Sequence, residues 1–311
     1  MQRDRKGLFQ SLYLETSGLT SAVETSHVRK QRLRETKRIL ALLISLAYWC
    51  LRTDYRAISR LAGKKDRTRS VVVLTYHSVT ASGVRHFEKQ MQTLRRRAKP
   101  VFADESTDSD GAKSVAVTFD DALQCVVDRA LPILAQHKIP ATIFVPTGFL
   151  GAEAGWMVPR AGQSGFVDQV VSTTTLASMD GRRVRIGSHT VTHPRLASLE
   201  DGQLHSELSV SRGTLEEITG APVTMLALPY GSFSANVIEA ARRAGYQRVF
   251  ANIPLPRNAW GAPLLVGRID VSPRDWPLEF RLKIDGAYEW LAWAIPVKRA
   301  ILKLLGKSKE S

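Results

Sequence analysis

The sequence contains few cysteines and no repeated or biased segments. Two cysteines, Cys50 and Cys125, among 311 residues provide neither a disulfide framework nor a cysteine-rich metal site. We expect both to be free thiols, which is compatible with a reducing compartment. The absence of internal repeats and low-complexity tracts excludes solenoid and fibrous classes. The composition, 44% hydrophobic and 23% charged, is that of a globular chain able to bury a full core.

Acidic residues are scarce near the N-terminus, where most of the net charge of +15 is concentrated. Residues 1–70 contain 16 Lys or Arg but only 6 Asp or Glu. A basic arm of this kind serves either nucleic acid or an anionic membrane surface. Nucleic-acid binding predicts basic residues interleaved with aromatics on the core, whereas here the excess lies largely in the arms. We therefore expect no nucleic-acid partner and favour membrane association.

The chain also lacks an apolar run long enough to cross a bilayer. Its uncharged run at 39–51 has 13 residues and is flanked by Lys and Arg, whereas a spanning helix needs ~20. A cleavable signal peptide is not expected, because its basic region would extend from Met1 to Arg38 and no small-residue cleavage site follows. A short signal anchor, an interfacial helix and a buried helix remain open. The lack of a cleavable signal favours the cytoplasmic face of a membrane.

The C-terminal segment at 286–311 has a similar character. Apolar residues recur there at helical spacing and Lys or Arg fill other positions, which predicts a basic amphipathic helix. Such a helix either packs on the domain or, with Trp290 and Trp293, lies at a membrane interface. We thus divide the chain into an N-terminal extension at 1–65, a central domain at 66–285 and this helix.

Between the two arms, short apolar strands alternate with helical segments. Strands are expected at 71–75, 115–118, 141–145, 184–188, 223–228, 247–251 and 264–266, and helices at 87–97, 130–134, 204–219 and 234–244. This alternation predicts a largely parallel sheet that is closed, or nearly closed, into an α/β barrel. The chemistry of such barrels gathers in loops at the carboxyl ends of the strands.

Two segments that follow strands carry candidate metal ligands. Asp120 and Asp121 end one strand, where one carboxylate would bind a metal and the other face a water, although Asp also caps helices. His189 and His193 have the spacing of ligands on one side of a helical turn, although such a pair also arises by chance. Two imidazoles and one carboxylate suit Zn²⁺, with Co²⁺, Ni²⁺ or Fe²⁺ as alternatives.

A third segment, Leu228-Pro229-Tyr230-Gly231, follows another strand. A turn at this place aims a backbone N–H at a developing oxyanion, although taken alone it is an ordinary turn. Phe149 and Trp156, which follow the strand at 141–145, either line a sugar site or pack in the core.

In this order, the three segments resemble the motifs of polysaccharide deacetylases with a NodB homology domain. Thr118-Phe119-Asp120-Asp121 is similar to the first motif, His189-Thr190-Val191-Thr192-His193 to the second, and Leu228-Pro229-Tyr230-Gly231 to the end of the third. The segments 74–79 and 141–145 and the pair Arg268-Ile269 also look like family positions. The resemblance covers about residues 71–285 and implies a distorted (β/α)7 barrel of NodB type.

The resemblance also implies a metal-dependent hydrolase that removes N-acetyl groups from an amino sugar in a polysaccharide or its precursor. Asp121, His189 and His193 would hold the divalent metal, with Zn²⁺ the first expectation. Asp120 would be the general base that activates the attacking water. The backbone N–H of Tyr230, in the turn that begins at Pro229, would stabilise the oxyanion.

Two departures from the family pattern leave an alternative open. No His follows His205, so the usual C-terminal Leu-x-His motif is missing and His77 of the opening strand becomes the candidate general acid. Ala227 stands where many members have an Arg that pairs with the base and lowers its pKa. Without that Arg, Asp120 would be a stronger base or less well positioned. The alternative is a catalytically impaired, glycan-binding pseudoenzyme, against which the complete set of metal ligands argues.

Overall fold

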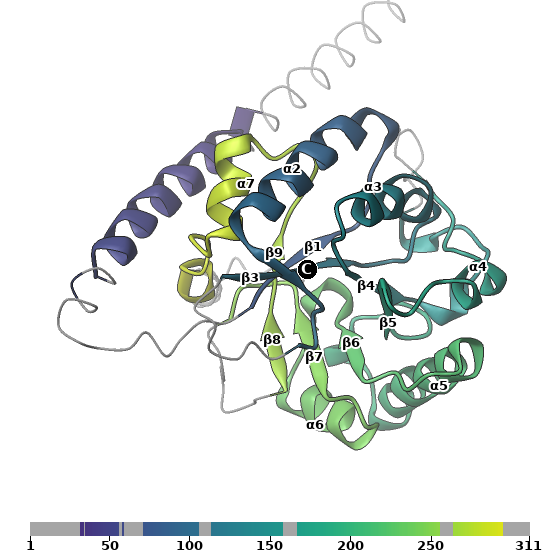
Figure 1. The fold of residues 1–311 in the computed structure, drawn as a ribbon. Coiled ribbons are helices and arrows are strands. Elements are labelled where there is room, and N and C mark those ends of the chain that lie inside the picture. Colours follow the sequence, from purple (N-terminus) through teal and green to yellow (C-terminus); the bar gives the residue numbers. More distant parts are fainter. Residues whose placement is uncertain are drawn as a thin grey trace, which may run out of the picture.

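The fold is a ring of parallel strands with helices packed outside it (Figure 1). The computed structural model describes residues 32–33, 35–55, 58, 71–105, 113–157, 167–255 and 264–294. The strands are β1 (Val72–Tyr76), β2 (Lys99–Val101), β3 (Ser114–Phe119), β4 (Ala141–Val145), β5 (Val184–Ser188), β6 (Met225–Ala227), β7 (Arg248–Ala251), β8 (Leu265–Gly267) and β9 (Ile269–Asp270). The helices are α2 (Val84–Arg97), α3 (Leu131–Gln136), α4 (Thr173–Ala177), α5 (Asp201–Thr219), α6 (Ala235–Arg243) and α7 (Pro277–Ile284).

The strand that closes the ring is interrupted at Arg268. Its first part, β8, pairs with β7, and its second part, β9, pairs with β1, both in parallel. The ring order is therefore β1, β3, β4, β5, β6, β7 and the β8–β9 strand, with β2 beside the first half of β3. This arrangement confirms the predicted distorted (β/α)7 barrel.

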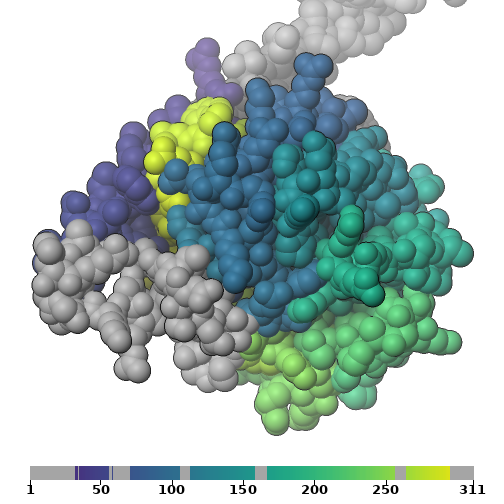
Figure 2. Space-filling view, in the orientation of Figure 1, coloured from purple at the N-terminus to yellow at the C-terminus, as the bar shows by residue number. Residues whose placement is uncertain are grey.

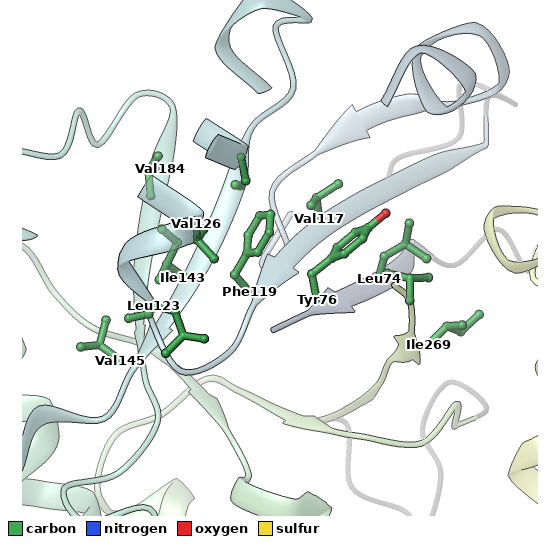
Figure 3. Packing of buried hydrophobic residues seen from close by; sticks show 14 of the residues in the cluster. Leu74, Tyr76, Val117, Phe119, Leu123, Val126, Ile143, Val145, Val184 and Ile269 are labelled. Carbon is green, nitrogen blue, oxygen red and sulfur yellow. The ribbon is translucent and has the colours of Figure 1, made fainter. Parts of the chain in front are cut away.

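The strands bury both of their faces, so the core has two parts. One part fills the ring interior and consists of Val73, Val101, Ala103, Ala116, Phe144, Met225, Ala227 and Phe250. The other lies between the strands and the helices, and Figure 3 shows members of it from β1, β3 and β4. Because successive strand side chains point to opposite faces, Ala116, Thr118 and then Asp120 share the inward direction. The alternation of side chains along β3 thus makes Asp120 point into the ring.

All strands and helices predicted for the central domain have a counterpart in the structure, but several bounds differ, and β2, β9, α4 and α7 were not predicted. The π-helix Val126–Ala130 precedes α3, whose first turn holds Pro132, where a single helix at 130–134 was predicted. β6 is limited to Met225–Ala227, shorter than the predicted 223–228. α5 starts at Asp201, before the predicted 204, and ends as predicted at Gly220, which adopts φ 64°.

The apolar run at 39–51 lies within a helix at 35–55 that packs along the outside of the domain beside α7 (Figure 2). Its inner side is attached to the segment after α7. Trp290 Nε1 donates a hydrogen bond to Ser45 Oγ at 2.8 Å, and Arg52 pairs with Glu289 at 2.9 Å. Within the described ranges, no helix combines the length and apolar character needed to cross a membrane. Residues 1–31, and 295–311 of the predicted C-terminal helix, lie outside the described part of the chain.

Candidate active site

The turn after β3 presents two adjacent carboxylates in different directions. Asp120 continues the inward side of β3 and is fully buried. Asp121 and Ala122 adopt left-handed backbone conformations, with φ of 69° and 48°. Such conformations are unfavourable for residues other than glycine and persist only where the surroundings fix them. Here they turn the Asp121 carboxylate toward the loop that follows β5.

His189 and His193 do not lie on a helical turn, and this part of the prediction was wrong. They occupy an irregular loop after β5, in which Thr190 and His193 have φ of 70° and 59°. Glu207 of α5 holds this loop, because its carboxylate accepts hydrogen bonds from two backbone N–H groups and one hydroxyl of the loop at 2.6–2.9 Å. The two imidazoles therefore meet through loop geometry, not through helical periodicity.

Asp121 and the two histidines form a compact set of three potential metal ligands. Asp121 Oδ1 lies 3.6 Å from His189 Nε2 and 3.4 Å from His193 Nε2, and the ligand atoms all fall within 4.8 Å of one another. His189 Nδ1 lies 2.9 Å from the Ala227 carbonyl oxygen, to which it donates as N–H, so Nε2 is left with a free lone pair. Asp121 Oδ1 is buried without a hydrogen-bond partner in the described part of the chain. These donors fit a divalent cation.

The electrostatics of the three side chains also fit a cation. Burial lowers the pKa of His193 to about 3, with a further contribution from His189, so His193 is a neutral imidazole able to ligate. Burial raises the pKa of Asp121, and the nearby His189 offsets this only in part. Trp156 stacks on His193 with ring centroids 4.2 Å apart, which fixes the imidazole plane from outside.

Asp120 has an arginine partner, which corrects the expectation drawn from Ala227. Arg268 Nη1 and Nη2 donate to the two Asp120 carboxylate oxygens at 2.6 and 2.7 Å, and both side chains are completely buried. Burial alone would raise the pKa of Asp120, but the Arg268 guanidinium and His189 outweigh it and hold this pKa well below its ordinary value. The ion pair comes from the break between β8 and β9 and leaves Ala227 to fill the ring interior.

The remaining predicted residues lie around this centre. His77 follows β1, is exposed on 45% of its side chain, and has Nδ1 4.0 Å from Asp270 Oδ1. Tyr230 adopts φ 56° in the turn after β6, and its ring lies 4.8 Å from that of His193. The hydrogen bonds of that turn run from Gly231 N and Ser232 N, so neither uses the Tyr230 N–H. Pro229, the first residue of this turn, is buried.

Sequence reasoning did not find the roles of three further residues. Glu207 lies on a helix beyond the histidine loop, and no spacing connects it to that loop. Arg268 was noted only for its likeness to a family position, without its partner. Trp156 was left between a sugar site and the core, and it packs on His193. All three depend on contacts between segments distant in sequence, for which a single sequence carries no signal.

The fold and the site together define an α/β barrel with a candidate metal centre at the carboxyl ends of its strands. The family model described as polysaccharide deacetylase matches residues 107–249. The chitooligosaccharide deacetylase of Bradyrhizobium sp. (strain ANU 289) is 30% identical over 159 residues, which are 50% of this chain and 63% of that protein. The structure of IcaB from Ammonifex degensii is 26% identical with a TM-score of 0.57, covering 70% of this chain and 98% of that one.

Other relatives agree with this relationship. The peptidoglycan-N-acetylmuramic acid deacetylase PdaA of Bacillus subtilis (strain 168) is 27% identical over 143 residues, or 45% of this chain and 47% of that protein. The chain therefore spans about half to two thirds of the length of these two curated relatives. The match of residues 107–249 to the polysaccharide deacetylase family agrees with the ordered motifs and with the NodB-type barrel.

Proposed function

We propose that this protein is a metal-dependent hydrolase that removes the N-acetyl group from an amino sugar in a polysaccharide or its precursor. The observation that carries the proposal is the convergence of Asp121, His189 and His193 beside the buried Asp120–Arg268 pair. A purely structural cluster would carry a cost at Asp121, because its Oδ1 is buried without a hydrogen-bond partner among the described residues. A bound divalent cation removes that cost.

Each residue of the proposed active site has a separate role in the reaction. A divalent cation held by Asp121, His189 and His193 would supply Lewis acidity for the acetamide carbonyl and acidify a nearby water. Asp120, kept ionised by Arg268, accepts a proton from the attacking water. The Tyr230 backbone N–H then faces the oxygen on which negative charge develops.

Completion of the reaction requires a proton on the leaving amine. His77 is our candidate donor, and its exposed ring at the end of β1, with Asp270 beside Nδ1, supports this role. The Asp270 carboxylate, 4.0 Å from His77 Nδ1, lies where it can orient the imidazole ring. The products are acetate and a glycan with a free amine.

Acetate release from N-acetylglucosamine oligomers tests this proposal. We expect release by the purified chain supplied with Zn²⁺ or Co²⁺, loss of release after treatment with a chelator, and recovery on adding the metal back. Metal content should fall in parallel when His189 is replaced by Ala. Release that survives complete removal of metal would contradict the metal dependence. Absence of release from any acetylated glycan, with metal bound, would favour the pseudoenzyme.

We also propose that the helix at 35–55 contacts an anionic membrane surface, with the cytoplasmic face still a prediction. Its outward side is apolar: Leu40 and Leu43 are each 57% exposed and Leu51 is 71% exposed. Lys37, which is also exposed, and the basic sequence around the helix provide charge for anionic headgroups. An apolar helical side flanked by cations is typical of helices that lie in the plane of a membrane interface.

Vesicle binding tests the membrane contact. The double variant Leu40→Gln with Leu43→Gln should lose most of the co-sedimentation of the protein with vesicles containing anionic lipid, because both substitutions place polar groups on the apolar side. Val210→Gln is the matched control, since Val210 is 50% exposed on α5, away from this helix. Equal sedimentation of the double variant and the control would contradict the proposal.

A further inference from the structure

A groove of about 810 Å³ opens beside the proposed active site, between the start of α2 and the segment that follows β9. One end is lined by Ser78, the residue after His77, and the opposite wall begins at Ser272, two residues after Asp270. His77 and Asp270, which precede these two lining residues in the sequence, have their side chains 4.0 Å apart, so the groove begins close to the proposed proton donor. Its size lies within the range of ~300–1,000 Å³ that is usual for ligand sites.

The groove carries positive charge for which the described residues provide no counter-charge. Lys89 of α2 and Arg274 both line it and are exposed. Over the ranges that the structure describes, neither side chain takes part in an ion pair or hydrogen bond. The acidic residue of the groove, Asp275, is already paired with Lys283 at 2.7 Å. The lining therefore presents two cations without a counter-charge.

An aromatic side chain lies in the same groove. Trp276 is 40% exposed, and the Arg38 guanidinium stacks on its ring at 4.2 Å from the centroid. Arg38 is held there by hydrogen bonds to Glu279 Oε2 and to the Arg274 carbonyl oxygen. The indole is thus fixed from one side, and Trp276 is one of the residues that line the groove. A rigid aromatic beside unpaired cations suits a ligand that combines a ring with an anionic substituent.

We propose that this groove binds an acidic group, carboxylate or phosphate, on the glycan next to the N-acetylated sugar. The inference rests on the proposed deacetylase function and narrows its substrate to anionic glycans. In this arrangement, Lys89 and Arg274 bind the acidic group through charge-assisted hydrogen bonds. Trp276 packs against the neighbouring sugar ring, while the acetamide lies at Asp121, His189 and His193.

The test compares three oligosaccharides of equal length that contain N-acetylglucosamine. One is neutral, one alternates with glucuronic acid, and one carries a terminal phosphate. We expect the wild-type chain to have a higher kcat/KM for an acidic oligomer than for the neutral one. The variant Lys89→Gln with Arg274→Gln should reduce this ratio roughly tenfold, mainly through KM, and added salt should reduce it in the wild type. If the double variant loses the preference for the glucuronic acid oligomer, the groove recognises a carboxylate. If it loses the preference for the phosphorylated oligomer, the groove recognises a phosphate.

The control variant is Arg95→Gln with Arg96→Gln, which removes two exposed cations of α2 that do not line the groove. It should keep the wild-type ratio. Calorimetric titration with the same oligomers measures binding independently of turnover, so the groove is tested even if no acetate is released. Equal affinity of the wild type and the Lys89–Arg274 variant for the acidic oligomers would overturn the proposal. Acetate release with unchanged ratios would overturn it as well, while leaving the deacetylase function intact.

Discussion

Replacing Asp120 with Asn should lower the kcat for acetate release by at least ~10²- to 10⁴-fold, the contribution typical of a general base. Asn has nearly the same shape and still accepts a hydrogen bond from Arg268, but it does not accept a proton from the attacking water. Because the ligands Asp121, His189 and His193 are unaltered, the variant should still bind metal. The measurement is the initial rate of acetate release together with metal content.

The control for this substitution is Asp128→Asn, which makes the same chemical change at an exposed residue of the π-helix. It should leave the rate and the metal content unchanged. Full activity of Asp120→Asn would exclude Asp120 as the base. Loss of activity accompanied by loss of metal would instead assign Asp120 to the metal site.

Replacing Arg268 with Leu should destabilise the fold by about 3–5 kcal/mol, because it leaves the Asp120 carboxylate buried without its counter-charge. It should also change the pH dependence. Burial raises the pKa of Asp120 and Arg268 is the main group that lowers it, so removing Arg268 raises that pKa. The acidic limb of the profile of kcat/KM against pH should therefore move to higher pH. Chemical denaturation and the pH profile measure the two effects separately.

The double variant Asp120→Asn with Arg268→Leu measures how much the interaction between the two side chains contributes to stability, separately from the effect of each substitution alone. Removing both charges leaves no unpaired buried ion, so its free energy of unfolding should exceed that expected from the sum of the two single changes. Simple additivity would mean that the two side chains do not stabilise each other. An unshifted acidic limb in Arg268→Leu would show that another group keeps Asp120 ionised.

The alternation of strands and helices was sufficient to predict the barrel, because strands such as β3 and β4 are buried on both faces and stand out as apolar runs. The position of Asp120 and Asp121 at a strand end could also be predicted, because the apolar run of β3 ends directly before them. The conformation of the loop that carries His189 and His193 could not be predicted from the sequence. Its spacing matches a helical turn, but left-handed residues and the Glu207 carboxylate impose another conformation.

The substitution of Ala227 for the usual Arg shows a second limit of sequence reasoning. A missing charge at one position indicates a weakened site only if no other segment supplies it. Here the closing strand brings Arg268 into the ring from 41 positions further along the chain. One of the two observations behind the pseudoenzyme alternative is thereby removed, because the base has its counter-ion, while the absence of the C-terminal Leu-x-His motif still stands.

Arg268 also lies at the seam of the barrel, between the half-strand that pairs with β7 and the half-strand that pairs with β1. Closure of the ring and the ionisation of Asp120 therefore depend on the same short segment. If this seam opens in a local unfolding event, the carboxylate loses its counter-charge at the same moment. A partly opened barrel would then be inactive. The measured activity therefore depends on how much of the protein has the β8–β9 strand closed, and not only on how much is folded.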